Sequence, residues 1–293
     1  MDYCEAYRTY QDKVENELEK SLPAGETYPS SIHQAMRYSV MGGGKRIRPV
    51  LVLATAEVVG GRADDVLPAA CALELIHAYS LIHDDLPAMD DDDFRRGKPS
   101  NHKVFGEAIA ILAGDALLTR AFFLLANAPA PNPEAWLRVV AEIAGAAGSE
   151  GMIGGQVADT CPDNSLAPGD ALDYIHRHKT GALLRAAVRA GAILAGAEEK
   201  QIKGLSAYGD NLGLLFQIVD DILDVEGDPA KLGKPIGSDE KNKKLTYPLL
   251  YGLPESKQKA ADAAAQAKAA LSLFGAEADF LRKLIDQTLV RDR

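Results

Sequence analysis

An apolar stretch runs directly into a group of aspartates at His77-Ala78-Tyr79-Ser80-Leu81-Ile82-His83-Asp84-Asp85-Leu86-Pro87-Ala88-Met89-Asp90. The same arrangement returns later, where Leu212-Gly213-Leu214-Leu215-Phe216-Gln217-Ile218-Val219 precedes Asp220-Asp221-Ile222-Leu223-Asp224. Both leading segments are too apolar for surface helices. We therefore expect both groups of acids to lie at the mouth of a buried cavity, where they are candidates for a functional site.

Helical periodicity extends from these stretches through most of the chain. Apolar residues recur at helical spacing at Leu67, Cys71, Leu75 and Ala78, whereas the alternation typical of strands is almost absent. Clusters of Gly and Pro divide the chain into about ten predicted helices and lie at residues 21–25, 42–44, 60–61, 128–133, 161–169, 227–229 and 252–254. None of these breaks suits a flexible linker, so the sequence predicts an all-α fold in one domain over residues 1–293.

Ionised carboxylates this close together need a counter-ion. At an effective dielectric of about 20, two of them roughly 4 Å apart repel by about 4 kcal/mol. On a helix, Asp220 and Asp224 project from one face with Asp221 beside them. Mg²⁺ binds such oxygen ligands and completes its shell with water and phosphate oxygens, so the two groups could clamp a diphosphate. A solvated acidic face, or aspartates that cap the next helix, is the alternative.

Basic residues accompany both groups of acids. The first group continues through Asp91-Asp92-Asp93 to Arg95-Arg96-Gly97-Lys98, where the arginines suit bidentate phosphate binding or simply neutralise the acids. Gly42-Gly43-Gly44-Lys45-Arg46-Ile47-Arg48-Pro49 joins a glycine-rich turn to three cations, which suits anion binding without the spacing of a P-loop. Lys231-Leu232-Gly233-Lys234 and Lys241 to Lys244 follow the second group, where charge balance alone could also explain them.

The overall charge and the cysteines narrow the class of protein. Lys+Arg of 32 against Asp+Glu of 42 gives a net charge of −10, which argues against nucleic-acid and anionic-membrane partners. Cys4, Cys71 and Cys161 stand singly, so neither a disulfide framework nor a thiolate zinc site is indicated. The amino terminus lacks an apolar signal region, and no run of eighteen apolar residues occurs. We expect a cytoplasmic protein with no membrane partner.

Taken together, the motifs resemble those of the trans-isoprenyl diphosphate synthases, and most closely the bacterial farnesyl diphosphate synthases, over essentially the whole chain. In chain order they are Gly43-Gly44-Lys45-Arg46-Ile47-Arg48-Pro49, Asp84-Asp85 with Asp90, Arg95-Arg96-Gly97, Gly154-Gly155-Gln156 to Asp159, Lys179-Thr180-Gly181, Phe216-Gln217 with Asp220-Asp221 and Asp224, and Gly233-Lys234. Such an ordered set makes a chance match an unsatisfactory explanation.

The resemblance implies a single-domain isoprenoid-synthase helical bundle around a deep central cavity, with the aspartate groups facing each other and two chains forming a homodimer. It implies about three Mg²⁺ per active site, held on the diphosphate of an allylic substrate by Asp84, Asp85, Asp90, Asp220, Asp221 and Asp224. Arg95, Lys179 and Lys234 would help to bind that diphosphate and would share the catalytic role with Asp84, Asp85, Asp90 and Asp220. Thr180 and Gln217 would lie beside them.

The resemblance also implies a second diphosphate site. Isopentenyl diphosphate would be bound without metal by the cations Lys45, Arg48 and Arg96 together with His77. The metal ions would neutralise the leaving pyrophosphate, the allylic C–O bond would ionise, and the isopentenyl double bond would attack the resulting cation. Taken singly, His77 could instead be a hydrogen-bonded core histidine, Gln217 a buried amide, and Lys179-Thr180 an ordinary helix surface.

Residues before the first aspartates bear on the product. Tyr79 and Ser80 lie five and four positions before Asp84, and Ile76 lies a further turn away, so all three should line the pocket beneath the metals. In the family, an aromatic residue at this place goes with a C15 product. The expected reaction therefore joins isopentenyl diphosphate to dimethylallyl and geranyl diphosphate and gives (2E,6E)-farnesyl diphosphate, with geranyl or geranylgeranyl diphosphate as alternative products.

The same residues distinguish chain elongation from three rival functions. Terpene cyclases generally lack the basic isopentenyl site and carry Asn, Ser or Glu in the second metal motif, so Lys45 to Arg48 and Asp220 to Asp224 favour chain elongation. The intact second group disfavours a noncatalytic regulatory subunit. The absence of an Asp-x-Asp-x-Asp-Gly loop disfavours an EF-hand calcium module. Whether Arg291-Asp292-Arg293 folds over the site is not decided by the sequence.

Overall fold

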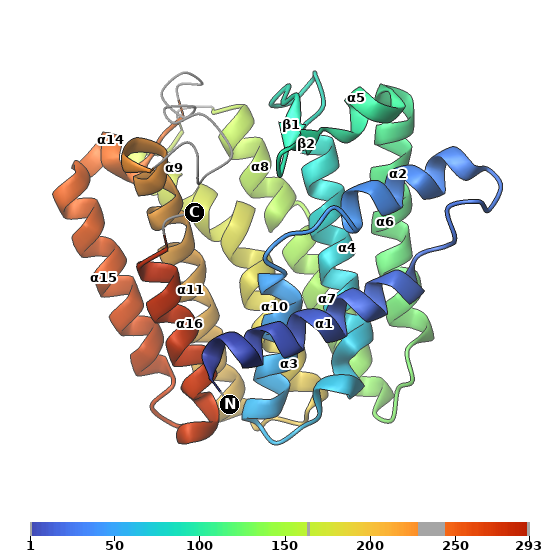
Figure 1. The fold of residues 1–293 in the computed structure, drawn as a ribbon. Helices are drawn as coiled ribbons and strands as arrows, with labels where there is room; N and C mark the ends of the chain where they lie inside the picture. The colour runs from blue at the N-terminus through green and yellow to red at the C-terminus, as the bar shows by residue number, and fades with distance from the viewer. Residues whose placement is uncertain (1, 163–164, 228–243, 292–293) are drawn as a thin grey trace.

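The computed structural model describes residues 2–162, 165–227 and 244–291. Long helices stand side by side, and α1 and α2 cross in front of them (Figure 1). The helices are α1 (Tyr3–Ser21), α2 (Ser30–Val40), α3 (Ile47–Val58), η1 (Ala63–Val66), α4 (Leu67–Asp84), α5 (Asn101–Phe105), α6 (Glu107–Asn127), α7 (Pro133–Ala147), α8 (Met152–Thr160), α9 (Pro168–Ile175), η2 (His176–Gly181), α10 (Ala182–Leu194), α11 (Glu199–Glu226), α14 (Tyr247–Tyr251), α15 (Leu253–Ala270), η3 (Ala276–Ala278) and α16 (Asp279–Leu289). The all-α prediction is confirmed.

Strand structure in the described part of the chain is limited to one short hairpin. β1 (Phe94–Arg95) pairs antiparallel with β2 (Lys98–Pro99), so that Arg95 lies opposite Lys98. Arg96 has a φ of 55° in the turn, and Gly97 follows with a φ of 75°. The hairpin thus folds the basic residues back toward the end of α4. An alternating pattern is absent here because strands of two residues are too short to produce one.

Helix α4 carries the first aspartates and lies within the core. It packs against α3 and α6, and Leu73, Leu75 and Ile76 are fully buried. A helix that is apolar around most of its circumference is stable only when other helices surround it. Buried apolar side chains from α1 to α16 form one continuous cluster around it. A single domain over residues 1–293 stays a prediction.

Helix ends coincide with the Gly and Pro clusters of the sequence. Asn132 caps α7 by accepting a hydrogen bond from Ala135 N at 3.2 Å, and Pro133 occupies the first helical position. Helix α11 begins with a capping box between Glu198 and Gln201. These local signals fix where α7 and α11 start.

Two glycines let helices approach closely near the Lys179 motif. A Cβ added to Gly155 on α8 would lie 2.1 Å from the Lys179 backbone nitrogen, and one added to Gly213 on α11 would lie 2.7 Å from Gly181 Cα. The segment between these contacts, η2, is π-helical. Such turns are rare and often occur at functional sites. Backbone proximity here positions Lys179 between α8 and α11.

Both aspartate groups lie at one end of the bundle. Helices α4 and α11 finish at the top of the view, where the hairpin, α8 and α14 also lie (Figure 1). Two helical segments are long and apolar enough to cross a membrane by length and composition, Ala63–Asp84 and Glu107–Asn127, with 67% and 33% of their windows buried inside the protein. The first is therefore a core helix, while α6 keeps an exposed apolar face.

Candidate active site

The first aspartate group closes the end of α4. Asp84 is the last helical residue, and the Asp90 backbone nitrogen donates to the Asp84 carbonyl at 2.9 Å, so the following loop folds back on the helix. The Gln156 amide on α8 donates to the Asp84 carboxylate. Burial raises the pKa of Asp84, and the neighbouring Asp90 adds to the rise against the lowering effect of Lys179. The carboxylate is thus held in a place that favours added positive charge.

An arginine from the hairpin binds the next aspartate. Arg95 Nε donates to Asp85 Oδ1 at 2.9 Å, and its Nη2 lies 3.2 Å from Asp92 Oδ2. Asp85 is buried. Burial raises the pKa of Asp85 even though the hydrogen bonds from Arg95 lower it. Arg95 therefore only partly compensates the buried charge.

Two lysines lie among the carboxylates of α8 and the first group. Lys179 Nζ is 2.6 Å from Asp159 Oδ2. Lys244 Nζ lies 3.6 Å from Asp90 Oδ2 and 3.7 Å from Asp159 Oδ2. The resemblance assigned Lys179 to diphosphate binding, and charge balance or anion binding was left open for the lysines that end at Lys244. The structure brings both to the same acidic end of the bundle.

The second aspartate group lies on the last turns of α11. Asp221 Oδ2 accepts a hydrogen bond from Tyr247 N at 2.8 Å and lies 3.7 Å from His176 Nε2. Burial lowers the pKa of His176 to about 4, so this imidazole is neutral near pH 7. Asp221 and Asp224 are buried. The middle aspartate is thus fixed by the backbone at the start of α14.

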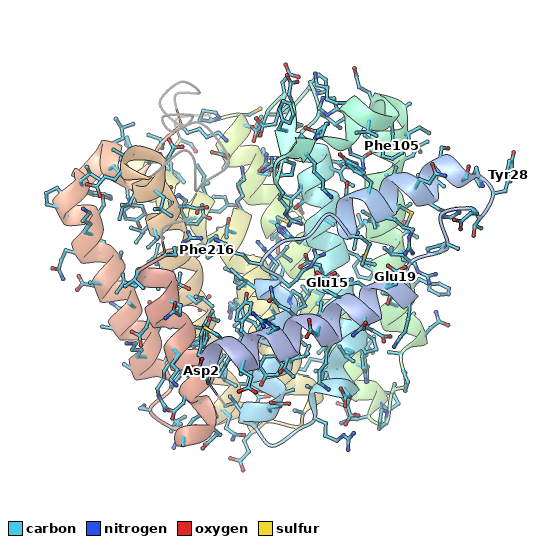
Figure 2. All side chains as sticks on the ribbon, viewed as in Figure 1. Asp2, Glu15, Glu19, Tyr28, Phe105 and Phe216 are labelled. Carbon is cyan, nitrogen blue, oxygen red and sulfur yellow. The ribbon has the colours of Figure 1, made fainter. Side chains whose placement is uncertain are left out.

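The carboxy-terminal segment reaches the second group. Arg291 Nη2 donates to Asp220 Oδ1 at 2.7 Å and to the Phe216 carbonyl at 2.7 Å. Its guanidinium lies 3.9 Å from the centroid of the Phe216 ring, which Figure 2 labels on α11. The sequence left open whether Arg291-Asp292-Arg293 contacts the site. Arg291 does, while Asp292 and Arg293 lie outside the described residues.

The donors fit a divalent cation, although they do not form a ready-made cage. Within residues 2–162, 165–227 and 244–291, no three His, Cys, Asp or Glu side chains converge on one point. The chain's own cations Arg95, Lys244 and Arg291 lie against the carboxylates. Hard carboxylate oxygens in two groups at one end of the bundle are the ligand type that Mg²⁺ or a similar ion prefers.

A separate group of cations lies beside the first aspartates. Arg48 Nε is buried and has no hydrogen-bond partner among the described residues. Burial lowers the pKa of Arg48 to about 10, against the raising effect of Glu74. Burial and the neighbouring arginines Arg48 and Arg96 hold the pKa of His77 well below its usual range. Buried positive charge with an unused donor is suited to a phosphate ligand.

Arg96 and Lys45 complete this group. The Arg96 guanidinium donates to the Gly43 carbonyl and packs on Gly44, whose φ is 135° and where a Cβ would lie 2.6 Å from Arg96 Cζ. The Lys45 carbonyl accepts a hydrogen bond from Tyr7 Oη at 2.6 Å. A small cavity of about 40 Å³ lies between the hairpin, α2 and α4 and is lined by Asp85, Arg95 and Arg96, among others. The glycine-rich loop and the hairpin therefore meet next to the carboxylates.

The other predicted site residues are placed as follows. Ile76 and Tyr79 are buried on α4, Ser80 donates to the His77 carbonyl at 2.9 Å, and the Tyr79 ring meets His83 edge to face at 5.7 Å between centroids. Thr180 and Gln217 lie half-buried on η2 and α11. Lys234 lies outside the described residues. The metal-binding, substrate-binding and chain-length roles stay predictions.

Several residues at the site carried no role in the sequence analysis. Gln156 and Asp159 were part of a motif without an assigned function, and Arg291 was left open. Glu74 gave no signal because a single acid within an apolar helix resembles an ordinary surface residue until the fold buries it. His83 Nε2 donates a hydrogen bond to the Ile111 carbonyl at 3.0 Å, a contact between α4 and α6 that a sequence cannot reveal.

Comparisons with known proteins agree with this geometry. The sequence model of the family Polyprenyl synthetase matches residues 29–274. A farnesyl diphosphate synthase of Geobacillus stearothermophilus is 53% identical over 235 residues, 80% of this chain and 79% of that protein. A geranylgeranyl diphosphate synthase of Cyanophora paradoxa is 49% identical over 266 residues, covering 89% and 87%.

A solved structure resembles the fold over nearly its whole length. The FPP/GFPP synthase of Zymomonas mobilis superposes with a TM-score of 0.85 and 37% identity, covering 98% of each chain. The family match spans well over half of this chain. The chain therefore belongs to the polyprenyl synthetase family and is a prenyltransferase.

Proposed function

We propose that this chain condenses isopentenyl diphosphate with dimethylallyl and geranyl diphosphate to give (2E,6E)-farnesyl diphosphate and pyrophosphate. The observation that carries the proposal is the pairing of two unlike anion sites. The half-buried Asp84 and the buried Asp85 call for added cations, whereas the group around Arg48 is already cationic and has an unused buried donor. One end of the bundle can thus hold two diphosphates by different means.

The allylic diphosphate belongs at the carboxylates. Asp84, Asp85, Asp90, Asp220, Asp221 and Asp224 would hold Mg²⁺, about three ions by the resemblance. When bound, these ions would neutralise the departing pyrophosphate. Lys179 would add a positive charge from η2. Asp159, which holds Lys179 Nζ at 2.6 Å, would keep that ammonium in place until the diphosphate arrives.

Isopentenyl diphosphate belongs at the cationic group. Lys45, Arg48 and Arg96 would bind its phosphates, and the low pKa of His77 makes this residue a neutral hydrogen-bond donor rather than a cation. Holding the isopentenyl double bond next to the ionising allylic carbon would turn the encounter of two substrates into an oriented reaction.

Product length is proposed from the packing of α4. Tyr79 is buried below the first aspartates and packs against His83, so its ring would block a prenyl chain longer than C15. Geranylgeranyl diphosphate is a second candidate product, because relatives of that name match this chain with nearly the same identity as the farnesyl diphosphate synthases. A farnesyl and a geranylgeranyl diphosphate synthase would differ in how deep the prenyl pocket is.

We further propose a cytoplasmic homodimer. The exposed side of α6 carries Ile111, Leu112 and Phe123, and Leu137 on the neighbouring α7 is 70% exposed. Several large apolar side chains exposed on neighbouring helices are typical of a protein interface. Substituting Leu112 and Phe123 by Asp should convert a dimer to monomers in sedimentation analysis. Unchanged sedimentation would contradict this interface.

The two unlike sites can be separated by calorimetry. Isopentenyl diphosphate should bind the purified protein in EDTA, since side-chain cations suffice for it. Geranyl diphosphate should bind at least about tenfold more tightly when Mg²⁺ is present, because its site is acidic. Equal metal dependence for both ligands would contradict the assignment of two sites.

A further inference from the structure

The loop that carries Lys45 and Arg48 also contains Arg46, whose side chain is buried. Arg46 has a left-handed backbone, with a φ of 55°, at the position just before α3. Its side chain is only 1% exposed. A long cation in a strained backbone position needs strong partners. Arg46 has them on three sides.

Each nitrogen of the Arg46 guanidinium donates a hydrogen bond. Nη1 donates to Glu74 Oε1 at 2.6 Å, Nε donates to Glu15 Oε1 at 2.7 Å, and Nη2 donates to the Val40 carbonyl at 2.5 Å. These partners come from α4, α1 and the end of α2. The guanidinium therefore ties three helices to one loop, and because its side chain is 1% exposed it is closed to a ligand from solvent.

Helix α1 holds the same loop at the next residue. The Lys45 carbonyl accepts hydrogen bonds from Tyr7 Oη at 2.6 Å and Gln11 Nε2 at 3.1 Å. With Glu15, three side chains of α1 thus fix two consecutive residues of the loop. Figure 2 labels Glu15 on α1, in front of the bundle.

Glu74 also acts on the cations of the proposed isopentenyl site. It is buried on α4, one turn before His77. Its charge opposes the lowering of the pKa of both Arg48 and Arg96 that burial causes. Glu74 and Arg46 thus form a buried ion pair beside Arg48 and Arg96, and the charge of Glu74 helps to keep these two arginines protonated.

We propose that Arg46, through Glu74 and Glu15, is a positioning residue of the isopentenyl diphosphate site: it holds the Lys45–Arg48 backbone so that the ligand-binding cations converge, and it does not contact the diphosphate. This inference rests on the proposed function. It separates the three basic residues of the loop into two that bind, Lys45 and Arg48, and one that orients them.

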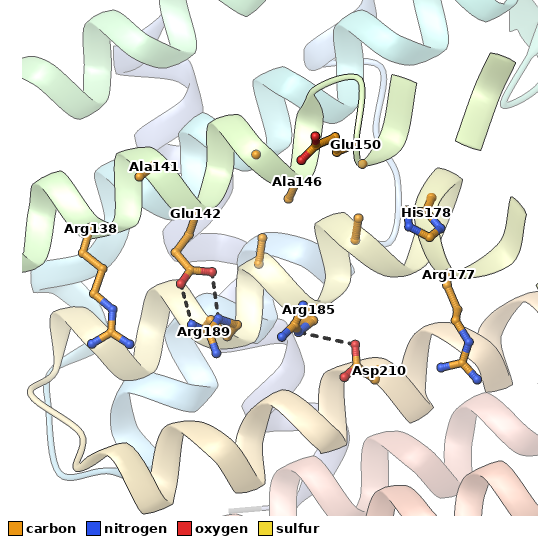
Figure 3. A pocket seen from close by; sticks show the side chains of 14 residues that line it. Arg138, Ala141, Glu142, Ala146, Glu150, Arg177, His178, Arg185, Arg189 and Asp210 are labelled. Atoms are coloured by element: carbon orange, nitrogen blue, oxygen red, sulfur yellow. Dashed lines mark hydrogen bonds and ion pairs between the residues drawn. The ribbon is translucent and has the colours of Figure 1, made fainter. Parts of the chain in front are cut away.

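The test uses three variants of the full chain. Arg46→Lys keeps the charge but puts all its donors on one nitrogen, so it cannot reach the three partners that three separate guanidinium nitrogens bind. Arg46→Met with Glu74→Met removes both buried charges, a change that buried pairs often tolerate without loss of folding. Arg189→Met is the matched control. Arg189 donates from Nε to Glu142 at 2.8 Å and from Nη1 to Ser206 at 2.7 Å, in the pocket between α7, α10 and α11 that Figure 3 shows.

Calorimetry of isopentenyl diphosphate in EDTA, without an allylic primer, measures the affinity of this site independently of turnover. Both Arg46 variants should weaken this affinity by about 10- to 100-fold, the range for losing hydrogen bonds to charged groups. The KM for isopentenyl diphosphate should rise similarly, while the KM for geranyl diphosphate should change by less than about twofold. Arg189→Met should lower the melting temperature and leave both values unchanged.

Two results would overturn the inference. One is a folded Arg46→Lys protein that binds isopentenyl diphosphate as the wild type does. The other is an equal weakening of both substrates, which would show a general effect on folding rather than positioning at one site. If the wild-type protein itself fails to bind isopentenyl diphosphate, the proposed function fails and the inference falls with it.

Discussion

Arg291 Nη2 donates to Asp220 Oδ1 at 2.7 Å, so a cation near the end of the chain occupies a carboxylate that the sequence assigns to metal binding. The Arg291 side chain is 11% exposed and packs on the Phe216 ring. Its charge serves Asp220 in the way a metal ion would. Arg291 and the metal should therefore compete for the same oxygen.

Arg291→Met tests this competition. Without metal, the variant should lose about 1 kcal/mol of stability, because an ion pair and a cation–π contact are removed. In turn, the Mg²⁺ concentration for half-maximal activity should fall about two- to fivefold, since no cation has to be displaced. Mn²⁺ binding followed by electron paramagnetic resonance should show the same trend.

Arg282→Met is the control for this prediction. Arg282 donates to the Phe274 carbonyl at 2.6 Å and to Asp279 at 2.7 Å on α16, and contacts neither aspartate group. Arg282→Met should lower the stability of the protein and leave the Mg²⁺ concentration for half-maximal activity unchanged. A weaker metal affinity in Arg291→Met would contradict competition.

The half-buried charge of Asp84 should lower the stability of the protein when no metal is bound. Because its pKa is raised in the folded protein, the folded state binds a proton more readily than the unfolded chain does. The resulting stabilisation is complete below the ordinary value of 3.8 and is lost as the pH rises through the raised pKa.

Asp84→Asn should therefore raise the stability of the metal-free protein at pH 7 by about 0.5–2 kcal/mol while activity is lost. Its melting temperature should also vary less with pH than that of the wild type in the range just above 3.8. Chemical denaturation in EDTA measures the first effect. A less stable Asp84→Asn protein would show that Asp84 is a structural rather than a strained functional carboxylate.

Product length should follow the volume at residues 79 and 80. Tyr79→Ala should lengthen the products beyond C15, because the buried ring is removed, and Ser80→Phe should shorten them. Tyr79→Phe is the matched control: Tyr79 Oη has no hydrogen-bond partner among the described residues, so C15 should persist. Unchanged products in Tyr79→Ala and Ser80→Phe, sized by chromatography after dephosphorylation, would remove these residues from the pocket floor.

The close contact between α8 and η2 should be sensitive to one methyl group. Gly155→Ala would place a Cβ 2.1 Å from the Lys179 backbone nitrogen. Helices α8 and η2 must then move apart, at a cost of about 1–3 kcal/mol of folding stability. The KM for geranyl diphosphate should rise as Lys179 shifts. Gly145→Ala on α7 is the control, because a Cβ there meets no atom within 4 Å. Equal effects of the two substitutions would mean that the α8–η2 contact does not position Lys179.

Helical periodicity and the Gly and Pro clusters predicted the all-α fold, because short-range sequence patterns determine where helices form and end. The apolar character of α4 required surrounding helices, and the Gly and Pro clusters mark its neighbours' ends. The π-helical turn at His176–Gly181 escaped prediction, since it depends on how α8 and α11 approach through Gly155 and Gly213. Packing between distant segments, rather than local propensity, sets that geometry.

For the candidate site, the sequence identified which charged residues belong together but not how they pair. Arg46 and Arg48 look alike in sequence, yet one is enclosed by Glu15, Glu74 and a carbonyl while the other keeps a buried Nε without a partner. Only the fold separates an arginine that orients from one that can bind. The contact of Arg291 with Asp220 likewise joins residues 71 positions apart.

The most direct measurement is a condensation assay with purified protein and isopentenyl diphosphate. Dimethylallyl, geranyl and farnesyl diphosphate are supplied in turn as primers, with and without Mg²⁺, and the dephosphorylated products are sized. We predict Mg²⁺-dependent C15 alcohol from the first two primers and no elongation of the third. Longer products would contradict the farnesyl assignment while keeping the prenyltransferase chemistry, and no condensation with any primer would contradict the proposed function as a whole.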